Sequence, residues 1–300
     1  QSEWRQPRTG IRQGCPQGCP LSPHLFILTM FAMFKDVNKQ IGTLNKRTFH
    51  DINFMELLYA DDTLIVSKDT RLAKKFLHLI EEESEYLHLK LDKRKCSFIS
   101  HNINSNILFE NGEPMQRTEE AVYLGAKINK KVDPKQETRA KISATMPILK
   151  KLDTFWCQAN CSRKCKLQVY QAVIVSKVLY GLETLEPTEA TCKLLDTFQL
   201  KGLRKILKLH TTFITRNNTN EFVYKRANEA VLAETEGDKR KIIPVSEILT
   251  TKKQKLLGHV LRRDFSHPAF QAIFTSTMAL PRESKTKKRV GRPRLNWTFE

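Results

Sequence analysis

Two adjacent carboxylates, Asp61 and Asp62, stand between two short apolar runs, Leu57–Tyr59 and Thr63–Val66. Both runs are rich in residues that favour β-strands, so the pattern predicts a buried β-hairpin with the two acids at its tip. Burying two ionised carboxylates side by side is costly without a compensating cation. Oxygen ligands suit Mg²⁺ or Mn²⁺, and pairs of such ions held by carboxylates catalyse phosphoryl transfer. Taken alone, the acid pair has a plainer explanation, because aspartate is a common turn residue.

A segment rich in glycine and proline precedes the acid pair. It runs from Gly10 to Phe26 and has the sequence GIRQGCPQGCPLSPHLF. Two further patterns follow the acids: Leu89–Cys96 has the sequence LKLDKRKC, and Val122–Gly125 has the sequence VYLG.

Together and in this order, these segments resemble the reverse transcriptases of non-LTR (LINE-type) retrotransposons over about residues 8–130. That family carries an Arg-Gln-Gly-Cys-Pro-Leu-Ser-Pro loop leading into a helix, then a Tyr/Phe-Ala-Asp-Asp hairpin, a lysine segment near the nucleotide and a hairpin that grips the primer end. The resemblance implies an RNA-directed DNA polymerase whose partners are an RNA template, a DNA primer and deoxynucleoside triphosphates. Its expected cofactors are two Mg²⁺ (or Mn²⁺) ions.

The resemblance also implies a role for each matching residue. Asp61 and Asp62 would hold the metals, and Lys95 would stand near the leaving pyrophosphate as a proton donor. Template and nucleotide would be positioned by residues of the loop and of the acid hairpin: Gln13, Gly14, Gln17, Gly18, Ser22, Pro23, Tyr59 and Ala60. The primer end would be held by Tyr123, Leu124 and Gly125. Plainer alternatives remain, namely a surface lysine in a basic run for Lys95 and simple strand packing for the Tyr123 segment.

The tetrapeptide Gln-Gly-Cys-Pro occurs twice in succession, as Gln13–Pro16 and Gln17–Pro20, whereas the family has it once. Register with the Leu-Ser-Pro that follows places the second copy beside the nucleotide, and register with the preceding Gly-Ile-Arg places the first. We expect the second copy to be seated and the first to bulge, because a helix starting at Ser22 anchors the second from its C-terminal side. Gln17 should then lie closer than Gln13 to the acid pair.

The family's polymerase uses a third carboxylate, on a strand upstream of the Arg-Gln-Gly loop, and fingers that bind the triphosphate. Asp36 and Asp51 follow the loop and do not match that carboxylate. The chain starts at Gln1 without an initiator methionine. We interpret it as a C-terminal piece, palm and thumb, of a longer reading frame that holds the missing parts.

Composition favours a nucleic-acid partner, since the formal net charge is +19 in a chain of 300 residues. A merely soluble basic surface would also account for the charge. No apolar run approaches the ~20 residues of a membrane span, and the start is polar rather than a secretory signal. Seven cysteines are too few for a disulfide framework in a chain of this length. We therefore expect a nuclear or cytoplasmic protein that does not bind membranes, and the oligomeric state stays open.

The first 130 residues carry the pattern of an α+β layer, as in the palm of a right-hand polymerase. Ser22 and Pro23 predict the start of a helix through about Val37 that is apolar on most faces and so buried beneath a sheet. Asp69–Thr70 predicts the cap of a second helix, whose apolar stripe consists of Leu72, Phe76, Leu79, Ile80 and Leu87. Alternation at Leu89–Asp92 predicts a strand, and Asn111–Gly112 predicts a turn.

Residues 131–232 have the periodicity of helices, which fits a thumb. Apolar residues predict three helical faces: Ile142, Met146, Leu149 and Leu152; then Leu167, Tyr170, Val173, Ile174, Lys177 and Val178; then Leu194, Leu195, Phe198, Leu200, Leu203, Ile206 and Leu207. Basic residues interleave with the third face and are candidate nucleic-acid contacts: Lys201, Arg204, Lys205 and Lys208. An ordinary solvated basic face is the alternative.

Residues 233–300 predict a basic and partly flexible C-terminal extension. Its candidate nucleic-acid contacts are Arg262, Arg263, Lys287, Lys288, Arg289, Arg292 and Arg294. The Gly-Arg-Pro-Arg sequence at 291–294 fits either a minor-groove contact or a nonspecific phosphate-binding tail.

Two functions therefore compete. The first is a reverse transcriptase palm and thumb whose full-length form carries out two-metal nucleotidyl transfer. The second is a catalytically inactive nucleic-acid-binding remnant of a decayed element, which the duplicated loop and the unmatched third carboxylate favour.

Overall fold

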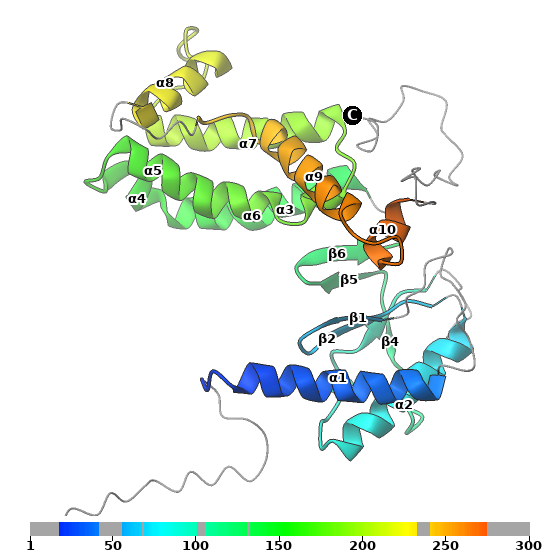
Figure 1. Cartoon of the computed structure of the whole chain (residues 1–300). Helices are drawn as coiled ribbons and strands as arrows, with labels where there is room; N and C mark the ends of the chain where they lie inside the picture. Colours follow the sequence, from blue (N-terminus) through cyan, green and yellow to red (C-terminus); the bar gives the residue numbers. More distant parts are fainter. Residues whose placement is uncertain are drawn as a thin grey trace, which may run out of the picture. The chain divides into compact units, whose positions relative to one another are not determined.

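The computed structural model describes residues 18–41, 56–67, 69–100, 106–130, 133–232 and 241–274. The chain divides into two compact units, Gln1–Lys130 and Lys131–Glu300. Each unit has a hydrophobic core of its own. Figure 1 shows the elements of both units along the chain.

The first unit combines two long helices with three small sheets. Its elements are α1 (Ser22–Ile41), β1 (Glu56–Tyr59), β2 (Asp62–Ile65), α2 (Thr70–Tyr86), β3 (Ser97–Phe98), β4 (Gln116–Arg117), β5 (Glu120–Tyr123) and β6 (Ala126–Asn129). Strands β1 and β2 pair antiparallel, as do β5 and β6, while β3 and β4 pair in parallel. Each sheet of the described residues has two strands, so the unit is α+β, as the sequence predicted.

Helix α2 forms where the sequence predicted it. Asp69 caps its first turn, since the Asp69 carboxylate accepts a 2.9 Å hydrogen bond from the backbone N–H of Arg71. Four residues of the predicted stripe are buried: Leu72, Phe76, Leu79 and Ile80. They pack against α1, where Phe76 meets Phe34 with ring centroids 6.3 Å apart. The contact between these two helices is the core of the first unit.

Helix α1 starts at Ser22 as predicted, but the prediction that the whole helix is buried is wrong. Burial is confined to its C-terminal half, at Met33, Phe34, Val37 and Ile41. Four large apolar residues before them are exposed: Leu25 (43%), Ile27 (54%), Leu28 (63%) and Phe31 (66%). A helix face is buried only where a partner surface covers it, and the small sheets described in this unit leave this face uncovered.

Two predictions for the segment after α2 have opposite outcomes. The strand predicted at Leu89–Asp92 is absent, and the described part of that segment is irregular, with Leu89 packed against the α1–α2 core. Its alternation is seen in burial, since Leu89 and Leu91 are half-buried while Lys90 and Asp92 are exposed, but the segment pairs with no strand of the described residues. The turn predicted at Asn111–Gly112 is confirmed, since Gly112 has a φ of +83° and its N–H bonds the carbonyl of Phe109 at 3.0 Å.

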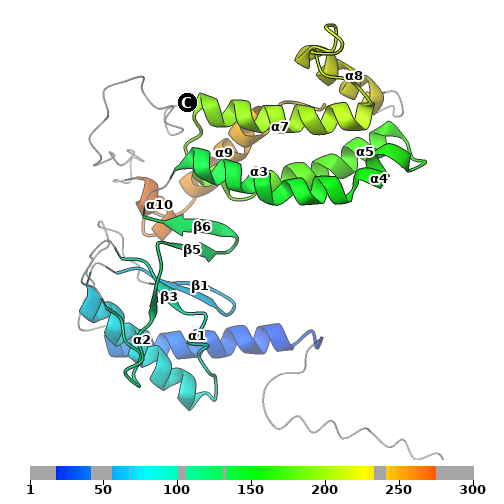
Figure 2. The ribbon, with the colours of Figure 1, turned by 180° about the vertical axis from the view of Figure 1, so that it is seen from behind.

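The second unit is helical. Its elements are α3 (Pro134–Lys151), α4 (Asp153–Gln158), α5 (Arg163–Val169), the π-helix η1 (Tyr170–Val175), α6 (Ser176–Leu179), the 3₁₀-helix η2 (Leu182–Thr184), α7 (Glu189–Leu207), α8 (Asn220–Leu232), α9 (Val245–Leu261) and α10 (Pro268–Ile273). Figure 2 shows α3, α5 and α7 from behind. None of the helices in the described residues is both long and apolar enough to cross a membrane.

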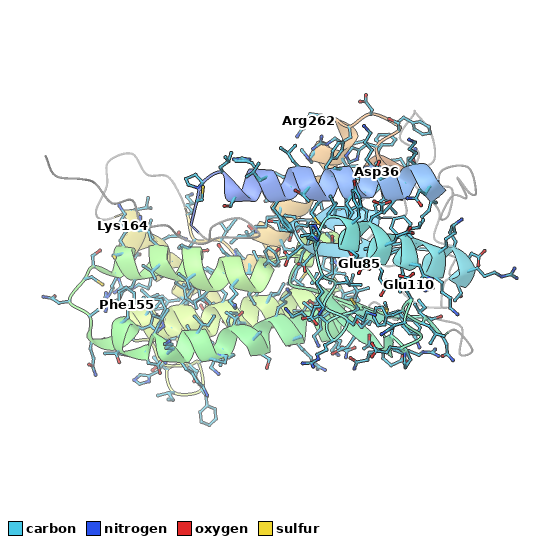
Figure 3. All side chains as sticks on the ribbon, turned by 90° about the horizontal axis from the view of Figure 1, so that it is seen from below. Asp36, Glu85, Glu110, Phe155, Lys164 and Arg262 are labelled. Carbon is cyan, nitrogen blue, oxygen red and sulfur yellow. The ribbon has the colours of Figure 1, made fainter. Side chains whose placement is uncertain are left out.

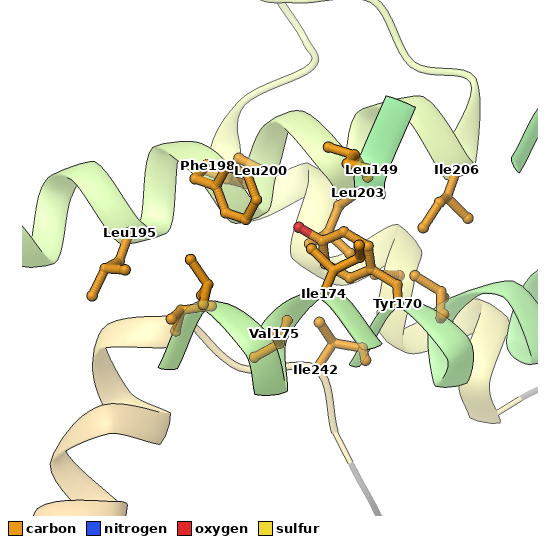
Figure 4. Close-up of a cluster of buried hydrophobic side chains, with 14 of the residues drawn as sticks. Leu149, Tyr170, Ile174, Val175, Leu195, Phe198, Leu200, Leu203, Ile206 and Ile242 are labelled. Atoms are coloured by element: carbon orange, nitrogen blue, oxygen red, sulfur yellow. The ribbon is translucent and has the colours of Figure 1, made fainter. Parts of the chain in front are cut away.

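The core of the helical unit contains most of the residues that the sequence predicted for its three faces. The prediction is wrong for Val173 and Lys177 of the second face, which are exposed, because Tyr170–Val175 forms a π-helix and the side chains there no longer follow α-helical spacing. Leu149 of α3, Ile174 of η1 and Leu203 of α7 are among its buried members (Figure 4). Trp156 and Tyr170 are both fully buried and meet edge to face with centroids 6.2 Å apart. Apolar spacing therefore predicted most of the packed residues of α3 and α7, and it failed where the chain departs from α-helical geometry.

Helix α9 belongs to this core, although the sequence pattern placed it in a basic extension. Val245 and Leu249 are buried in the same cluster. The side chain of Gln199 connects the elements, because its Oε1 accepts from Val245 N–H at 3.0 Å and from Tyr224 Oη at 2.8 Å. Its Nε2 donates to the carbonyl of Ile243 at 2.9 Å. Residues 241–261 thus fold with the helices before them.

Candidate active site

The acid pair lies at the tip of the β1–β2 hairpin, as predicted. Tyr59 pairs with Asp62 and Leu57 with Leu64. Since directly opposite residues share a face of the sheet, Asp62 lies on the same face as Tyr59. Ala60 and Asp61 form the two-residue turn between the strands. The hairpin therefore holds both carboxylates at one end of the sheet.

The turn requires an unusual backbone conformation. Ala60 has a φ of +53°, in the left-handed region that residues with a Cβ rarely adopt. This conformation costs about 1–2 kcal/mol for such a residue. Strained backbone of this kind is typical of functional sites.

The hairpin is exposed, and the prediction of a buried hairpin is wrong. The exposed fractions are 40% for Leu57, 43% for Leu58 and 63% for Tyr59, and both aspartates are exposed. Two strands cannot bury both of their own faces, and the hairpin pairs with no third strand in the described residues. The carboxylates therefore face water. The argument that two buried carboxylates need a compensating cation does not apply to them.

The donor set still suits a hard divalent ion, because two adjacent carboxylates offer oxygen ligands that are open to solvent. No third acidic, cysteine or histidine side chain joins them to form a metal-binding group anywhere in the described chain. Asp36 lies on α1 and is exposed (Figure 3). The described residues thus provide two of the ligands that a two-metal site would need.

The hairpin is attached to the α1–α2 core at its open end. Asn38 on α1 donates a 2.7 Å hydrogen bond from Nδ2 to Oε1 of Glu56. Ile65, the cross-strand partner of Glu56, packs against the core. The acid tip is consequently the free end of a hairpin whose base is fixed.

The segment predicted to grip the primer forms a second hairpin, β5–β6. Its turn residues Leu124 and Gly125 have φ values of +49° and +74°, as a two-residue type I′ turn requires. Tyr123 donates a hydrogen bond of 3.0 Å from its hydroxyl to the carbonyl of Leu57 in β1. Partial burial, and then the nearby charge of Asp62, raise the pKa of Tyr123 above its ordinary value. The structure thus brings Tyr123 to the acid hairpin.

Lys95 lies in a turn that follows the Leu89–Asp92 segment. Its side chain is 86% exposed, and its Nζ lies 3.7 Å from Oδ2 of Asp92. An ion pair that is this open to solvent holds a side chain weakly. Lys95 is therefore accessible, and its assignment as a proton donor stays a prediction.

Only part of the predicted template loop falls within the described residues. Gly18 adopts a φ of +87° with open space around it, which suits glycine. Ser22 and Pro23 form the first turn of α1. Gln13, Gly14 and Gln17 lie outside the described residues, and so does the predicted ordering of Gln13 and Gln17 relative to the acid pair.

The four basic candidates on α7 do not form one uniform face. Lys201 and Lys208 are exposed. Arg204 instead donates from Nη2 to the carbonyl of Asn218 at 3.3 Å and to Oδ1 of Asn220 at 2.9 Å. Lys205 forms an ion pair with Asp153. Arg204 and Lys205 thus support the fold of the helical unit.

The remaining basic candidates lie after α8. Arg262 and Arg263 are exposed at the end of α9, where Arg262 is labelled in Figure 3. Nη2 of Arg263 lies 2.8 Å from Nε2 of His259. The tail candidates Lys287, Lys288, Arg289, Arg292 and Arg294 lie outside the described residues.

Sequence reasoning missed one conspicuous surface residue, Phe213 in the loop between α7 and α8. Its side chain is 97% exposed. The available signal was a Phe-Ile pair without helical or strand periodicity, inside a segment of threonine, asparagine and basic residues.

Residues 1–128 match the sequence model of the family described as reverse transcriptase (RNA-dependent DNA polymerase). The matched range contains the acid hairpin, Lys95 and all but the last residue of the β5–β6 hairpin, and it ends before the helical unit. A search of curated proteins found no match to the chain. The family match therefore supports a reverse transcriptase domain in the N-terminal part of this chain.

Proposed function

We propose that this chain is the palm and thumb of the RNA-directed DNA polymerase of a non-LTR retrotransposon. The observation that carries the proposal is the position of Asp61 and Asp62. They are adjacent, exposed and held at the tip of a Tyr-Ala-Asp-Asp hairpin, inside the range that matches the reverse transcriptase family.

The proposed reaction is nucleotidyl transfer. The 3′-hydroxyl of a DNA primer attacks the α-phosphate of a deoxynucleoside triphosphate, a new phosphodiester forms, and pyrophosphate leaves. Asp61 and Asp62 would hold Mg²⁺ or Mn²⁺, which when bound stabilises the charge on the phosphate oxygens. Lys95 would give a proton to the leaving pyrophosphate.

The second hairpin supports the placement of a primer near the acids. Tyr123 is bonded to the backbone of β1, and the charge of Asp62 contributes to its raised pKa. The tip of β5–β6 is thus fixed close to the acid pair. A primer end lying along Tyr123, Leu124 and Gly125 would be within reach of both aspartates. The helical unit would act as the thumb and contact the product duplex through exposed lysines such as Lys201 and Lys208.

The exposed apolar surface supports the interpretation that the palm is completed by further strands. Leu28 and Phe31 of α1 are 63% and 66% exposed, and the hairpin carries Leu57 and Leu58 at 40% and 43%. In a complete palm, strands bearing the third carboxylate would cover such a surface. The proposed polymerase activity therefore belongs to the full-length enzyme.

A catalytically inactive nucleic-acid-binding remnant is the second candidate. It is favoured by the absence, in the described residues, of a third metal ligand beside Asp61 and Asp62. It differs from the first candidate in requiring no metal at the hairpin. Metal binding to the hairpin therefore separates the two.

The test measures the affinity of the whole chain for Mn²⁺ by electron paramagnetic resonance. We expect weak binding that becomes at least about tenfold weaker in the double variant Asp61→Asn/Asp62→Asn, because both anionic ligands are lost. Asp36→Asn/Glu85→Gln is the matched control, since it also removes two negative charges, from exposed positions on α1 and α2. Equal Mn²⁺ affinity of the wild type and the double variant would refute the metal site and leave the remnant as the better account.

A primer-extension assay on an RNA template completes the test. Because the described residues bring only two carboxylates together at the hairpin, we expect no primer extension in Mg²⁺ or Mn²⁺. Extension that disappears in Asp61→Asn would overturn this expectation and show that the hairpin polymerises without a third acid.

A further inference from the structure

The loop between α7 and α8 presents an aromatic ring to solvent at a fixed position. It comprises residues 208–219, and Phe213 stands at its tip with 97% of its surface exposed. Ile214 beside it is 67% exposed. The loop is visible next to α8 in both ribbon views (Figures 1 and 2). A side chain this exposed contributes almost nothing to the hydrophobic core.

Hydrogen bonds fix the base of this loop. Asn218 is buried, and its Nδ2 donates to the carbonyl of His210 at 2.9 Å, which closes the loop on itself. Arg204 of α7 donates to the carbonyl of Asn218 and to Oδ1 of Asn220, which attaches the closed loop to two helices. At the tip, the N–H groups of Ile214 and Thr215 both bond the carbonyl of Thr211 at 3.0 Å. The backbone that carries Phe213 is therefore ordered before any partner binds.

The loop that carries the ring is basic, and the first acidic residue after it is Glu221, at the start of α8. Lys208, His210 and Arg216 are all exposed within the loop, and residues 208–220 contain no aspartate or glutamate. An exposed ring among cations matches the two requirements for binding unpaired bases: a face for stacking and positive charge for the backbone. A rigid loop also lowers the entropy cost of forming such a contact.

We propose that the α7–α8 loop binds single-stranded nucleic acid by stacking an unpaired base on Phe213, with Lys208 and Arg216 contacting the flanking phosphates. The inference rests on the proposed function insofar as nucleic acid is the partner, and it adds a site outside the matched polymerase range. Stacking requires an unpaired base, so the site distinguishes single strands from duplex.

The test compares the affinity of the whole chain for an oligothymidylate and for a DNA duplex of the same length, in buffer without divalent metal or nucleotide. Phe213→Ala should weaken binding to the single strand about 5- to 150-fold, as expected for the loss of one stacked base. Binding to the duplex should stay within about twofold of the wild type, since the phosphate contacts remain. Phe213→Trp should restore binding to the single strand.

Tyr86→Ala is the matched control. Tyr86 is also a highly exposed aromatic, at 80%, but it follows the acidic Glu85, which is labelled in Figure 3. This variant should bind the single strand as the wild type does. Circular dichroism should show all three variants folded, because neither side chain is buried.

Three outcomes would overturn the inference. They are an unchanged affinity of Phe213→Ala for the single strand, an equal loss for single strand and duplex, or a specific loss in Phe213→Ala of binding to vesicles containing anionic lipids with nucleic-acid binding unchanged. The last outcome would assign the loop to a membrane surface. Because no metal is present, these results are independent of whether Asp61 and Asp62 bind Mn²⁺.

Discussion

The hydroxyl of Tyr123 donates a 3.0 Å hydrogen bond to the backbone carbonyl of Leu57. This bond joins the β5–β6 hairpin to the hairpin that carries Asp61 and Asp62, across 66 residues of sequence. Each hairpin has only two strands, and sheets of this size are marginally stable by themselves. The bond between them is consequently part of what positions the acid pair.

Tyr123→Phe should loosen the acid hairpin while leaving the α1–α2 core intact. The variant removes one donor and leaves the ring, so the expected loss is about 1 kcal/mol. It should appear as faster hydrogen exchange at the amides of β1 and β2, with exchange in α2 unchanged. Tyr86→Phe, at an exposed position on α2, is the control. Equal exchange in β1 and β2 for Tyr123→Phe and wild type would show that the bond does not restrain the hairpin.

The local features of this unit were predictable from sequence because their causes are local. The cap at Asp69 and the stripe of Leu72 and Phe76 depend on residues within a few turns of one another. The acid hairpin likewise follows from two short runs of β-forming residues around a turn, whereas the β5–β6 hairpin was expected only from the family resemblance.

The exposure of the N-terminal half of α1 and of the acid hairpin was not predictable from sequence. Apolar composition indicates which residues can be buried, but not whether a partner surface is present to cover them. Leu28 and Leu58 are exposed for this reason. The link from Tyr123 to Leu57 joins distant segments and leaves no periodic signal. Phe213 lies in a loop whose apolar residues follow neither helical nor strand periodicity, so no pattern in the sequence indicated it.

The hydrogen bonds of Arg204 indicate that the basic residues of α7 have different roles: some stabilise the fold and others are free to bind nucleic acid. Lys208→Gln should lower the salt dependence of nucleic-acid binding if Lys208 contacts phosphate, by about one unit of slope, without altering stability. Arg204→Gln should instead destabilise the helical unit by about 1–3 kcal/mol, because it leaves the carbonyl of Asn218 without its charged donor. Urea unfolding and a salt titration of duplex binding measure the two effects. A stable Arg204→Gln variant with a reduced salt slope would reverse the assignment.

Gly202 of α7 predicts a site where the helices cannot accept a side chain. A Cβ at this position would clash with Cε2 and Oη of Tyr170, whose ring is fully buried. Gly202→Ala should therefore destabilise the helical unit by about 1–3 kcal/mol, even though alanine favours helices. Chemical denaturation gives this value directly.

Gly258→Ala is the matched control for Gly202→Ala. Gly258 lies within α9, and the nearest atom to its Cβ would be Nη1 of the flexible Arg262 at 3.4 Å. This substitution should stabilise the chain by up to about 1 kcal/mol. The cost of Gly202→Ala should also shrink in a Tyr170→Leu background, since the opposing ring is gone. A cost that is the same in both backgrounds would mean that Tyr170 is not the obstacle.

Two buried tyrosines predict a loss of stability at high pH. Burial raises the pKa of Tyr170 and of Tyr224 well above the ordinary value, with a smaller contribution from the charge of Asp196 at Tyr224. In the unfolded chain both phenols ionise near pH 10. The folded state therefore holds these protons more tightly, and its stability is fully present below about pH 10 and falls as the pH rises above it.

Urea unfolding midpoints at increasing pH measure this dependence. Tyr224→Phe should be less stable at neutral pH, because Tyr224 donates to Oε1 of Gln199 at 2.8 Å. The same variant should lose stability less steeply above about pH 10, since one fewer buried phenol can ionise on unfolding. If the slopes of Tyr224→Phe and of the wild type coincide in this range, Tyr224 is not a source of the alkaline instability.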